Sequence, residues 1–91
     1  MSECQTELLI KNQKGLHARA AAAFVKCAEQ FDAEVTVEKG GQVVSGDSIL
    51  GLMMLSASKG STIYVKTIGN EAEKAISAIT LLVDSLFGEE Q

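Results

Sequence analysis

The chain is poor in the side chains that build metal and disulfide sites. It has two cysteines and a single histidine in 91 residues. Cys4 and Cys27 are too far apart for a CxxC redox or zinc pair, and one histidine adds too few ligands to complete a metal site. We therefore expect two free thiols, with Cys27 facing the core, and neither a bound metal nor a cofactor.

Long apolar runs and excess positive charge are also absent. The apolar runs span only a few residues, far fewer than the ~20 that a membrane helix needs. Residues 1–5 contain neither the basic nor the apolar segment of a secretion signal. The formal net charge is −4, which argues against nucleic acid or an anionic membrane as the main partner, since both call for a basic face. We expect a cytoplasmic protein that is not inserted in a membrane.

Length and periodicity predict one α+β domain over residues 1–91. Lys39-Gly40-Gly41 is typical of a hairpin turn. Each predicted helix carries apolar residues that must be buried, so we expect an open-faced two-layer sandwich of order β-α-β-β-α-β-α, in which three helices cover one face of a four-stranded sheet. The strands are predicted at about 5–11, 33–38, 42–45 and 61–68, and the helices at about 17–31, 48–56 and 70–87.

The last predicted helix opens at Asn70, whose side chain is expected to cap it while Glu73 completes a capping-box-like pair. Apolar residues then recur at helical spacing and predict one buried stripe. The stripe consists of Ala72, Ala75, Ile76, Ile79, Leu82, Val83 and Leu86. The late acidic residues are expected to form a solvated helix face and tail; they are Glu71, Glu73, Asp84, Glu89 and Glu90.

The single histidine stands where a polar turn meets an alanine-rich segment. Residues 18–31 contain no Gly or Pro, so they predict a helix with His17 at or beside its N-cap. The first N–H groups of a helix lack intrahelical acceptors and favour an anion. An imidazole can be a neutral nucleophile near pH 7, and the planar fork of Arg19 suits phosphate oxygens. These residues favour a phosphoryl-accepting site, although a lone histidine at such a junction is more often only a solvated or capping residue.

A second candidate site lies at the predicted helix that follows Ser48. The plain role of this serine is an N-cap whose hydroxyl accepts a backbone N–H. Leu52 and Leu55 fit the buried side of the helix. The other apolar residues are candidates for an exposed partner-binding patch, although core packing could account for most of them. These candidates are Ile49, Leu50 and Met53.

The stretch Gly15-Leu16-His17-Ala18-Arg19 resembles the active-site signature of HPr, the histidine-containing phosphocarrier of the bacterial phosphotransferase system, and of its nitrogen-branch relative. The resemblance covers roughly residues 7–87, and separate motifs occur in the order and at the separations of the family. These further motifs are Phe24-Val25-Lys26, Ala33-Glu34-Val35-Thr36-Val37, Gly46-Asp47-Ser48-Ile49-Leu50-Gly51-Leu52 and Ala57-Ser58-Lys59-Gly60.

The resemblance implies an antiparallel sheet and a carrier protein rather than an enzyme. Such a carrier would accept a phosphoryl group from phosphorylated enzyme I on Nδ1 of His17 and pass it to an enzyme IIA-type acceptor. Arg19 and the backbone N–H groups of Ala18 and Arg19 would stabilise the phosphoryl oxygens. Ser48 matches a serine that a dedicated HPr kinase phosphorylates in many bacteria, which leaves a regulatory protein of the same fold as an alternative.

Two positions depart from the family pattern. Ala20 stands where relatives commonly have proline, so the first helical turn should be slightly less rigid, which affects the rate and lifetime of phosphorylation more than its existence. Lys26 keeps one basic residue on the first helix, whereas Glu29 lies where many relatives carry a second one. We expect a monomer whose partners contact Ala20, Lys26, Ile49, Leu50 and Met53. The sequence leaves open whether the acceptors are sugar permeases or nitrogen-branch regulators, and an interaction domain without phosphate chemistry is the remaining alternative.

Overall fold

The computed structural model describes residues 2–89, and its elements follow the predicted order β-α-β-β-α-β-α. A short turn, η1 (Leu86–Gly88), follows the last helix. The strands are β1 (Ser2–Leu9), β2 (Glu34–Lys39), β3 (Gln42–Ser45) and β4 (Thr62–Gly69), and the helices are α1 (Ala18–Ala28), α2 (Ile49–Met54) and α3 (Ala72–Asp84). Among residues 2–89, no helix has the length and apolar character needed to cross a membrane.

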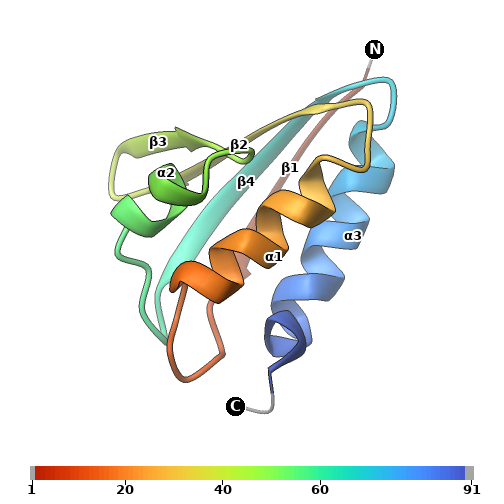
Figure 1. Ribbon diagram of the computed structural model, residues 1–91. Helices are drawn as coiled ribbons and strands as arrows, with labels where there is room; N and C mark the ends of the chain where they lie inside the picture. The colour runs from red at the N-terminus through yellow and green to blue at the C-terminus, as the bar shows by residue number, and fades with distance from the viewer. Residues whose placement is uncertain (1, 90–91) are drawn as a thin grey trace.

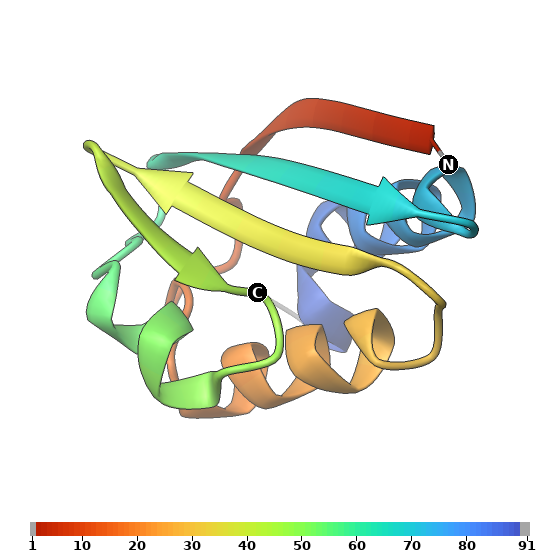
Figure 2. The same ribbon diagram turned by 90° about the horizontal axis from the view of Figure 1, so that it is seen from above.

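The four strands form one antiparallel sheet in the order β1-β4-β2-β3. The predicted hairpin is confirmed: Gly40 and Gly41 have φ of +58° and +84°, and Lys39 pairs with Gln42 on either side of them. Two successive positive φ angles are the geometry of a tight hairpin turn, which glycine adopts without steric cost. All three helices lie against the same face of the sheet, so the other face is open (Figures 1 and 2). The predicted fold class is therefore confirmed.

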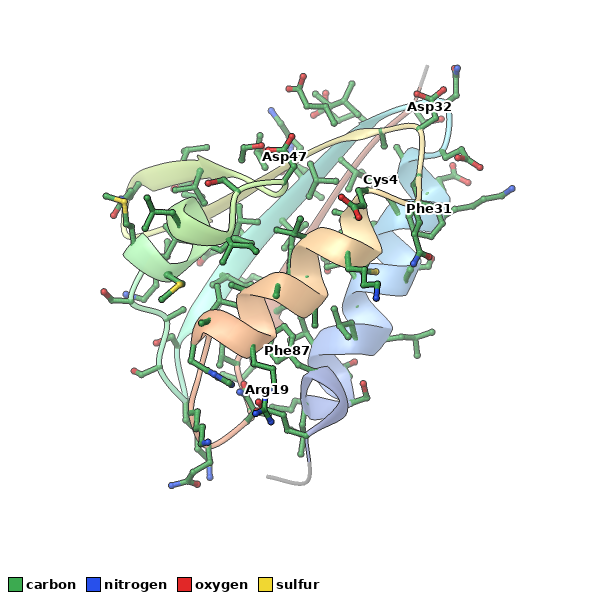
Figure 3. All side chains as sticks on the ribbon, viewed as in Figure 1. Cys4, Arg19, Phe31, Asp32, Asp47 and Phe87 are labelled. Carbon is green, nitrogen blue, oxygen red and sulfur yellow. The ribbon has the colours of Figure 1, made fainter. Side chains whose placement is uncertain are left out.

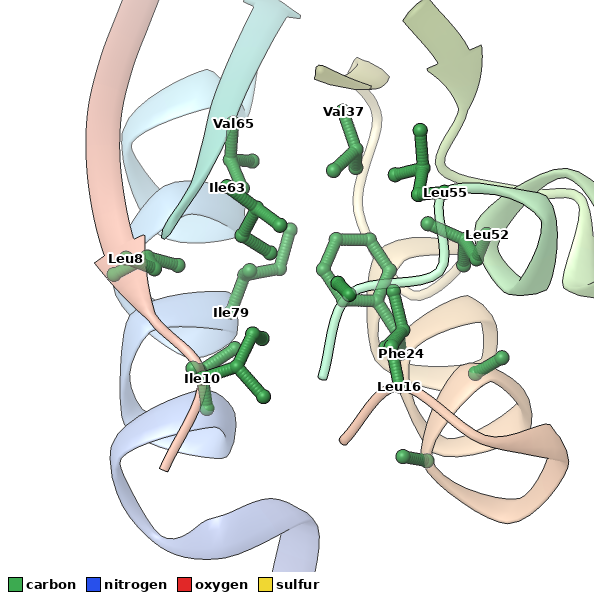
Figure 4. Packing of buried hydrophobic residues seen from close by; sticks show 14 of the residues in the cluster. Leu8, Ile10, Leu16, Phe24, Val37, Leu52, Leu55, Ile63, Val65 and Ile79 are labelled. Atoms are coloured by element: carbon green, nitrogen blue, oxygen red, sulfur yellow. The ribbon is translucent and has the colours of Figure 1, made fainter. Parts of the chain in front are cut away.

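The core lies between the sheet and the helices. Alternate residues of the strands point toward the helices, as the twofold period of a strand requires. Phe24 of α1 and Ile79 of α3 are both 0% exposed and pack with the strand residues in a single cluster (Figure 4). Cys27 is half-buried against this core, and its burial raises the pKa of the thiol. The stripe predicted for α3 is buried or half-buried along its length.

Several element boundaries differ from those predicted. β1 begins at Ser2 rather than near residue 5, because Ser2 pairs with Gly69 at the far end of β4. Ile10 lies beyond β1 yet still donates its N–H to the carbonyl of Ser61 at 2.8 Å. α1 ends at Ala28, before the predicted residue 31, because the chain turns there toward β2.

The predicted capping box of α3 is wrong. The N-cap of α3 is Glu71, and it makes no side-chain capping bond. Asn70 instead donates from Nδ2 to Asp32 Oδ2 at 3.0 Å, and Glu71 Oε1 accepts from the N–H of Asp32 at 2.8 Å. These polar groups therefore join the loop before α3 to the loop before β2. Their tertiary hydrogen bonds replace the local capping bonds that the sequence predicts.

The chain reverses direction after α3. The helix ends at Asp84, and Leu86, Phe87 and Gly88 then have φ of +62°, +56° and +79°. Phe87 is only 7% exposed and packs against the core. The prediction of a helix continuing to Phe87 is wrong, since this left-handed turn replaces its last residues. The reversal carries Glu89 back to the N-terminal end of α1.

Candidate functional site

His17 is the N-cap of α1, as the sequence predicts. Its backbone is extended, with φ −78° and ψ −178°, and its carbonyl accepts the first helical hydrogen bond, from Ala21 at 2.8 Å. The N–H groups of Ala18, Arg19 and Ala20 precede this bond and therefore have no acceptor within the helix. Their dipoles favour a negatively charged group beside His17.

A glycine turn holds His17 in place. Gly15 has φ of +65°, and the next residue, Leu16, donates its N–H to the carbonyl of Ala57 at 2.8 Å. A Cβ on Gly15 would lie 2.5 Å from that same carbonyl oxygen. This close approach explains why glycine stands two residues before the histidine. The hydrogen bond between Leu16 and Ala57 joins the start of α1 to the loop that follows α2.

The imidazole of His17 has one partner among residues 2–89. Its Nε2 lies 2.6 Å from Oε2 of Glu89, and the two side chains are 26% and 15% exposed. Nδ1 has no hydrogen-bond partner within those residues. An ionised carboxylate can only accept, so a neutral ring bound to it carries its proton on Nε2. This tautomer leaves the lone pair of Nδ1 available.

Asn12 fixes the carboxylate from the opposite side. It is fully buried, and its Nδ2 donates to the carbonyl of Gly15 at 2.7 Å and to Oε1 of Glu89 at 2.9 Å. The hydrogen bonds from Asn12 and from His17 hold the pKa of Glu89 below its ordinary value. Glu89 is therefore ionised near neutral pH, as its role as an acceptor requires.

Arg19 is exposed in the first turn of α1 (Figure 3). Its side chain makes no hydrogen bond or ion pair with any residue between 2 and 89. Lys26 is exposed in the last turn of the same helix. The predicted partner contact at Ala20 is wrong, because this residue is 0% exposed and its methyl group packs in the core.

An open hollow lies beside His17. It is formed by the turn before α1 and the loop after α2, where Ser56 has a φ of +52°. Its lining residues are Lys14, Leu16, His17, Ser56, Ala57 and Ser58. A group held on His17 would therefore lie beside the loop that ends α2.

The predicted features of α2 are confirmed in their geometry. Oγ of Ser48 accepts the N–H of Gly51 at 3.0 Å, and Leu52 and Leu55 are buried. The expected exposed residues are exposed, but the sequence analysis missed a further neighbour on the helix, Met54, which is 59% exposed. We call the exposed apolar residues of this helix the α2 patch: Ile49, Leu50, Met53 and Met54.

Asn12 and Glu89 were not predicted as site residues. Glu89 was expected in a solvated tail, but it contacts a residue 72 positions earlier. Glu71 and Asp84 also have partners, the latter accepting from Lys11 at 3.3 Å. Glu90 lies outside the described residues. A local sequence pattern does not predict contacts between residues far apart in the chain, because periodicity indicates only which face of a helix or strand is buried.

The fold is that of a small phosphocarrier protein. A family model described as "PTS HPr component phosphorylation site" matches residues 4–85. The chain belongs to the HPr family of phosphocarrier proteins of the phosphotransferase system.

Relatives from both branches of the family are similar to this chain. It is 48% identical over 80 residues to the phosphocarrier protein HPr of Neisseria meningitidis serogroup A, covering 88% of this chain and 90% of that protein. It is 42% identical over 89 residues to the phosphocarrier protein NPr of Shewanella violacea, covering 98% of each. The crystal structure of HPr-C-His from Thermoanaerobacter tengcongensis matches with a TM-score of 0.88 and 43% identity over all of both chains.

Proposed function

We propose that this chain accepts a phosphoryl group from phosphorylated enzyme I on Nδ1 of His17 and donates it to an enzyme IIA-type acceptor. One observation carries the proposal: Nε2 of the only histidine is bound to a carboxylate, while Nδ1 has no partner within residues 2–89. The ring stands at the N-terminus of α1, where backbone N–H groups favour the phosphoryl oxygens.

The transfer exchanges one P–N bond for another. The Nδ1 lone pair of His17 attacks phosphorus in line, and the bond to the donor imidazole breaks with its electron pair returning to that ring. Charge on the three equatorial oxygens is stabilised by the Arg19 guanidinium and by the N–H groups of Ala18 and Arg19. Donation to the acceptor is the same exchange in reverse, so the protein is a carrier and not an enzyme.

Docking is proposed at the surface that surrounds the hollow. The α2 patch is apolar and contains two flexible methionines, which suits successive partners of modest affinity. Lys26 adds one positive charge on α1. One chain supplies Asn12, His17, Arg19 and Glu89 to the site, so we propose that it acts as a monomer. We also propose that it acts in the cytoplasm.

Incubation with phosphoenolpyruvate and enzyme I tests the proposal. We expect the intact mass to increase by one phosphoryl group, and the modification to be lost in acid. Omission of either reagent is the control and should leave the mass unchanged. A protein that gains no mass with a demonstrably active enzyme I would refute the carrier function.

Arg19→Lys should slow phosphorylation of His17 by about tenfold, because a lysine cannot reproduce a bidentate contact and loses one charge-assisted hydrogen bond. Thermal stability should not change, since the Arg19 side chain has no partner among residues 2–89. Rapid-quench measurement of the transfer rate, together with a melting curve, checks both expectations. Equal rates for the variant and the parent would mean that Arg19 is only a solvated helix residue.

Ser48→Asp and Ile49→Glu test the docking surface. Aspartate is a good N-cap, so Ser48→Asp should keep the free energy of unfolding within about 1 kcal/mol. Both variants place a negative charge at the α2 patch and should slow transfer from enzyme I, more strongly at low salt. Leu81→Glu is the matched control, because Leu81 is 71% exposed on α3. Unchanged transfer in both folded variants would show that α2 is not the docking surface.

A regulatory role for Ser48 is a second candidate function. Its side chain is half-exposed and already lies at the N-terminus of α2. A phosphate added there by an HPr serine kinase would be compatible with the helix dipole and would repel acidic partner surfaces. Ser48→Asp approximates this state with a smaller charge.

A further inference from the structure

The chain from Ser85 to Glu89 folds back over the start of α1. Leu86 and Phe87 adopt left-handed backbone conformations, with φ of +62° and +56°, which bulky residues rarely do. Residues persist in such conformations only where their surroundings hold them there, and they gather at functional sites. Two contacts hold this turn: Phe87 is buried in the core, and the carboxylate of Glu89 binds Asn12 and His17.

We propose that Glu89 is a positioning residue for phosphoryl transfer, which accepts the Nε2–H of His17 and so reserves Nδ1 as the nucleophile. The inference rests on the proposed function. The contact is 2.6 Å long and largely shielded, since the Glu89 side chain is only 15% exposed. Attack on phosphorus gives the imidazole a positive charge, and the adjacent carboxylate stabilises that charge as it forms.

Asn12 determines which way Glu89 can act. Its Nδ2 faces two acceptors, the Gly15 carbonyl and Glu89 Oε1, and its buried Oδ1 has no partner among residues 2–89. The amide therefore cannot turn over without placing its oxygen against two other oxygens. A carboxylate or an amide at position 89 must therefore present an oxygen to Asn12 Nδ2, and its other terminal atom then faces Nε2 of His17.

This constraint makes Glu89→Gln an informative variant. The new amide oxygen stays opposite Asn12, so its NH₂ group faces Nε2 of His17 and donates to it. The neutral ring must then carry its proton on Nδ1, which removes the nucleophilic lone pair. Phosphorylation should slow by about tenfold or more, the loss expected for one hydrogen bond to a charged group.

Two measurements on the full-length chain test the inference. Long-range ¹H–¹⁵N NMR reports the tautomer of His17 at about pH 8.5, where an ordinary imidazole is neutral. Rapid-quench transfer from phosphorylated enzyme I reports the rate. We expect the Nε2–H tautomer in the parent, the Nδ1–H tautomer with slow transfer in Glu89→Gln, and parental behaviour in Glu73→Gln, a charge-matched change at an exposed residue of α3.

The possible failures are distinguishable. A Glu89→Gln variant with the parental tautomer and the parental rate would overturn the positioning role while leaving the carrier function intact. A parent chain that accepts no phosphoryl group would refute the proposed function, and the positioning role with it. Melting curves identify any variant that has lost its fold. If Glu89→Gln does not fold, Glu89→Ala replaces it, because alanine removes the hydrogen bonds to both Asn12 and His17. In Glu89→Ala we expect a mixture of the two His17 tautomers and slow transfer, and the parental tautomer would contradict the positioning role.

Discussion

His17→Ala is expected to abolish phosphorylation by phosphoenolpyruvate and enzyme I while the protein stays folded. His17 is the only histidine, so no other imidazole can accept the phosphoryl group. Its side chain makes no capping bond to α1, and Asn12 still donates to Glu89 when the imidazole is absent, so the loss of stability should be that of one hydrogen bond, about 1–3 kcal/mol. Intact-mass analysis and a melting curve measure the two effects.

A second variant, His17→Gln, controls for the loss of side-chain volume and polarity at the N-cap. Both variants should give no acid-labile phosphoryl adduct. Persistent phosphoenolpyruvate-dependent labelling in either one would place the accepting group elsewhere in the chain and refute the assignment of His17.

Gly15→Ala is expected to lower the free energy of unfolding by about 2–4 kcal/mol, because it combines a left-handed alanine with a backbone clash. The new Cβ would lie 2.5 Å from the carbonyl oxygen of Ala57, and that carbonyl accepts the N–H of Leu16. Relief of the clash must move the turn that carries His17. Phosphorylation should therefore slow as well.

Gly40→Ala is the matched control for this prediction. Gly40 also has a positive φ, +58°, but nothing lies within 4 Å of its added Cβ. Urea unfolding measures the loss of free energy of unfolding in each variant. Gly40→Ala gives the cost of a positive φ at alanine, about 1–2 kcal/mol, and the additional loss in Gly15→Ala is due to the clash with Ala57. An equal loss of stability in both variants would show that the loop after α2 yields freely and does not constrain the His17 turn.

The parts of the site that the sequence predicts depend on local chemistry. A polar turn followed by an alanine-rich segment is enough to place His17 at an N-cap, and a serine before an apolar run is enough to place the Ser48 cap. Hairpin formation at Gly40-Gly41 is likewise decided by two adjacent residues. In each of these three cases the local conformation depends on residues that are close together in the chain.

The parts that the sequence does not predict depend on long-range packing. The contact between His17 and Glu89 requires the chain to reverse after α3, and neither Leu86 nor Phe87 has an intrinsic preference for positive φ. Asn70 resembles a helix cap in the sequence, but in the structure its side chain donates to Asp32, which is 38 residues away along the chain. Tertiary contacts of this kind override local propensity.

The wrong prediction for Ala20 has a different origin. Ala20, Phe24 and Ala28 follow one another at the spacing of a single helix face, and all three are buried. The prediction for position 20 followed from the family resemblance, in which relatives commonly have a proline there. The helical period of the apolar residues in α1 indicates that this position faces the core.

The most direct test of the carrier function is a two-step relay followed by intact mass. The chain is first phosphorylated with phosphoenolpyruvate and enzyme I, then freed of both, and finally mixed with an enzyme IIA domain. We expect this chain to gain one phosphoryl group and then to lose it as the acceptor gains one. A chain that never gains the group, or that keeps it in the presence of a panel of sugar-branch and nitrogen-branch acceptors, would contradict the account.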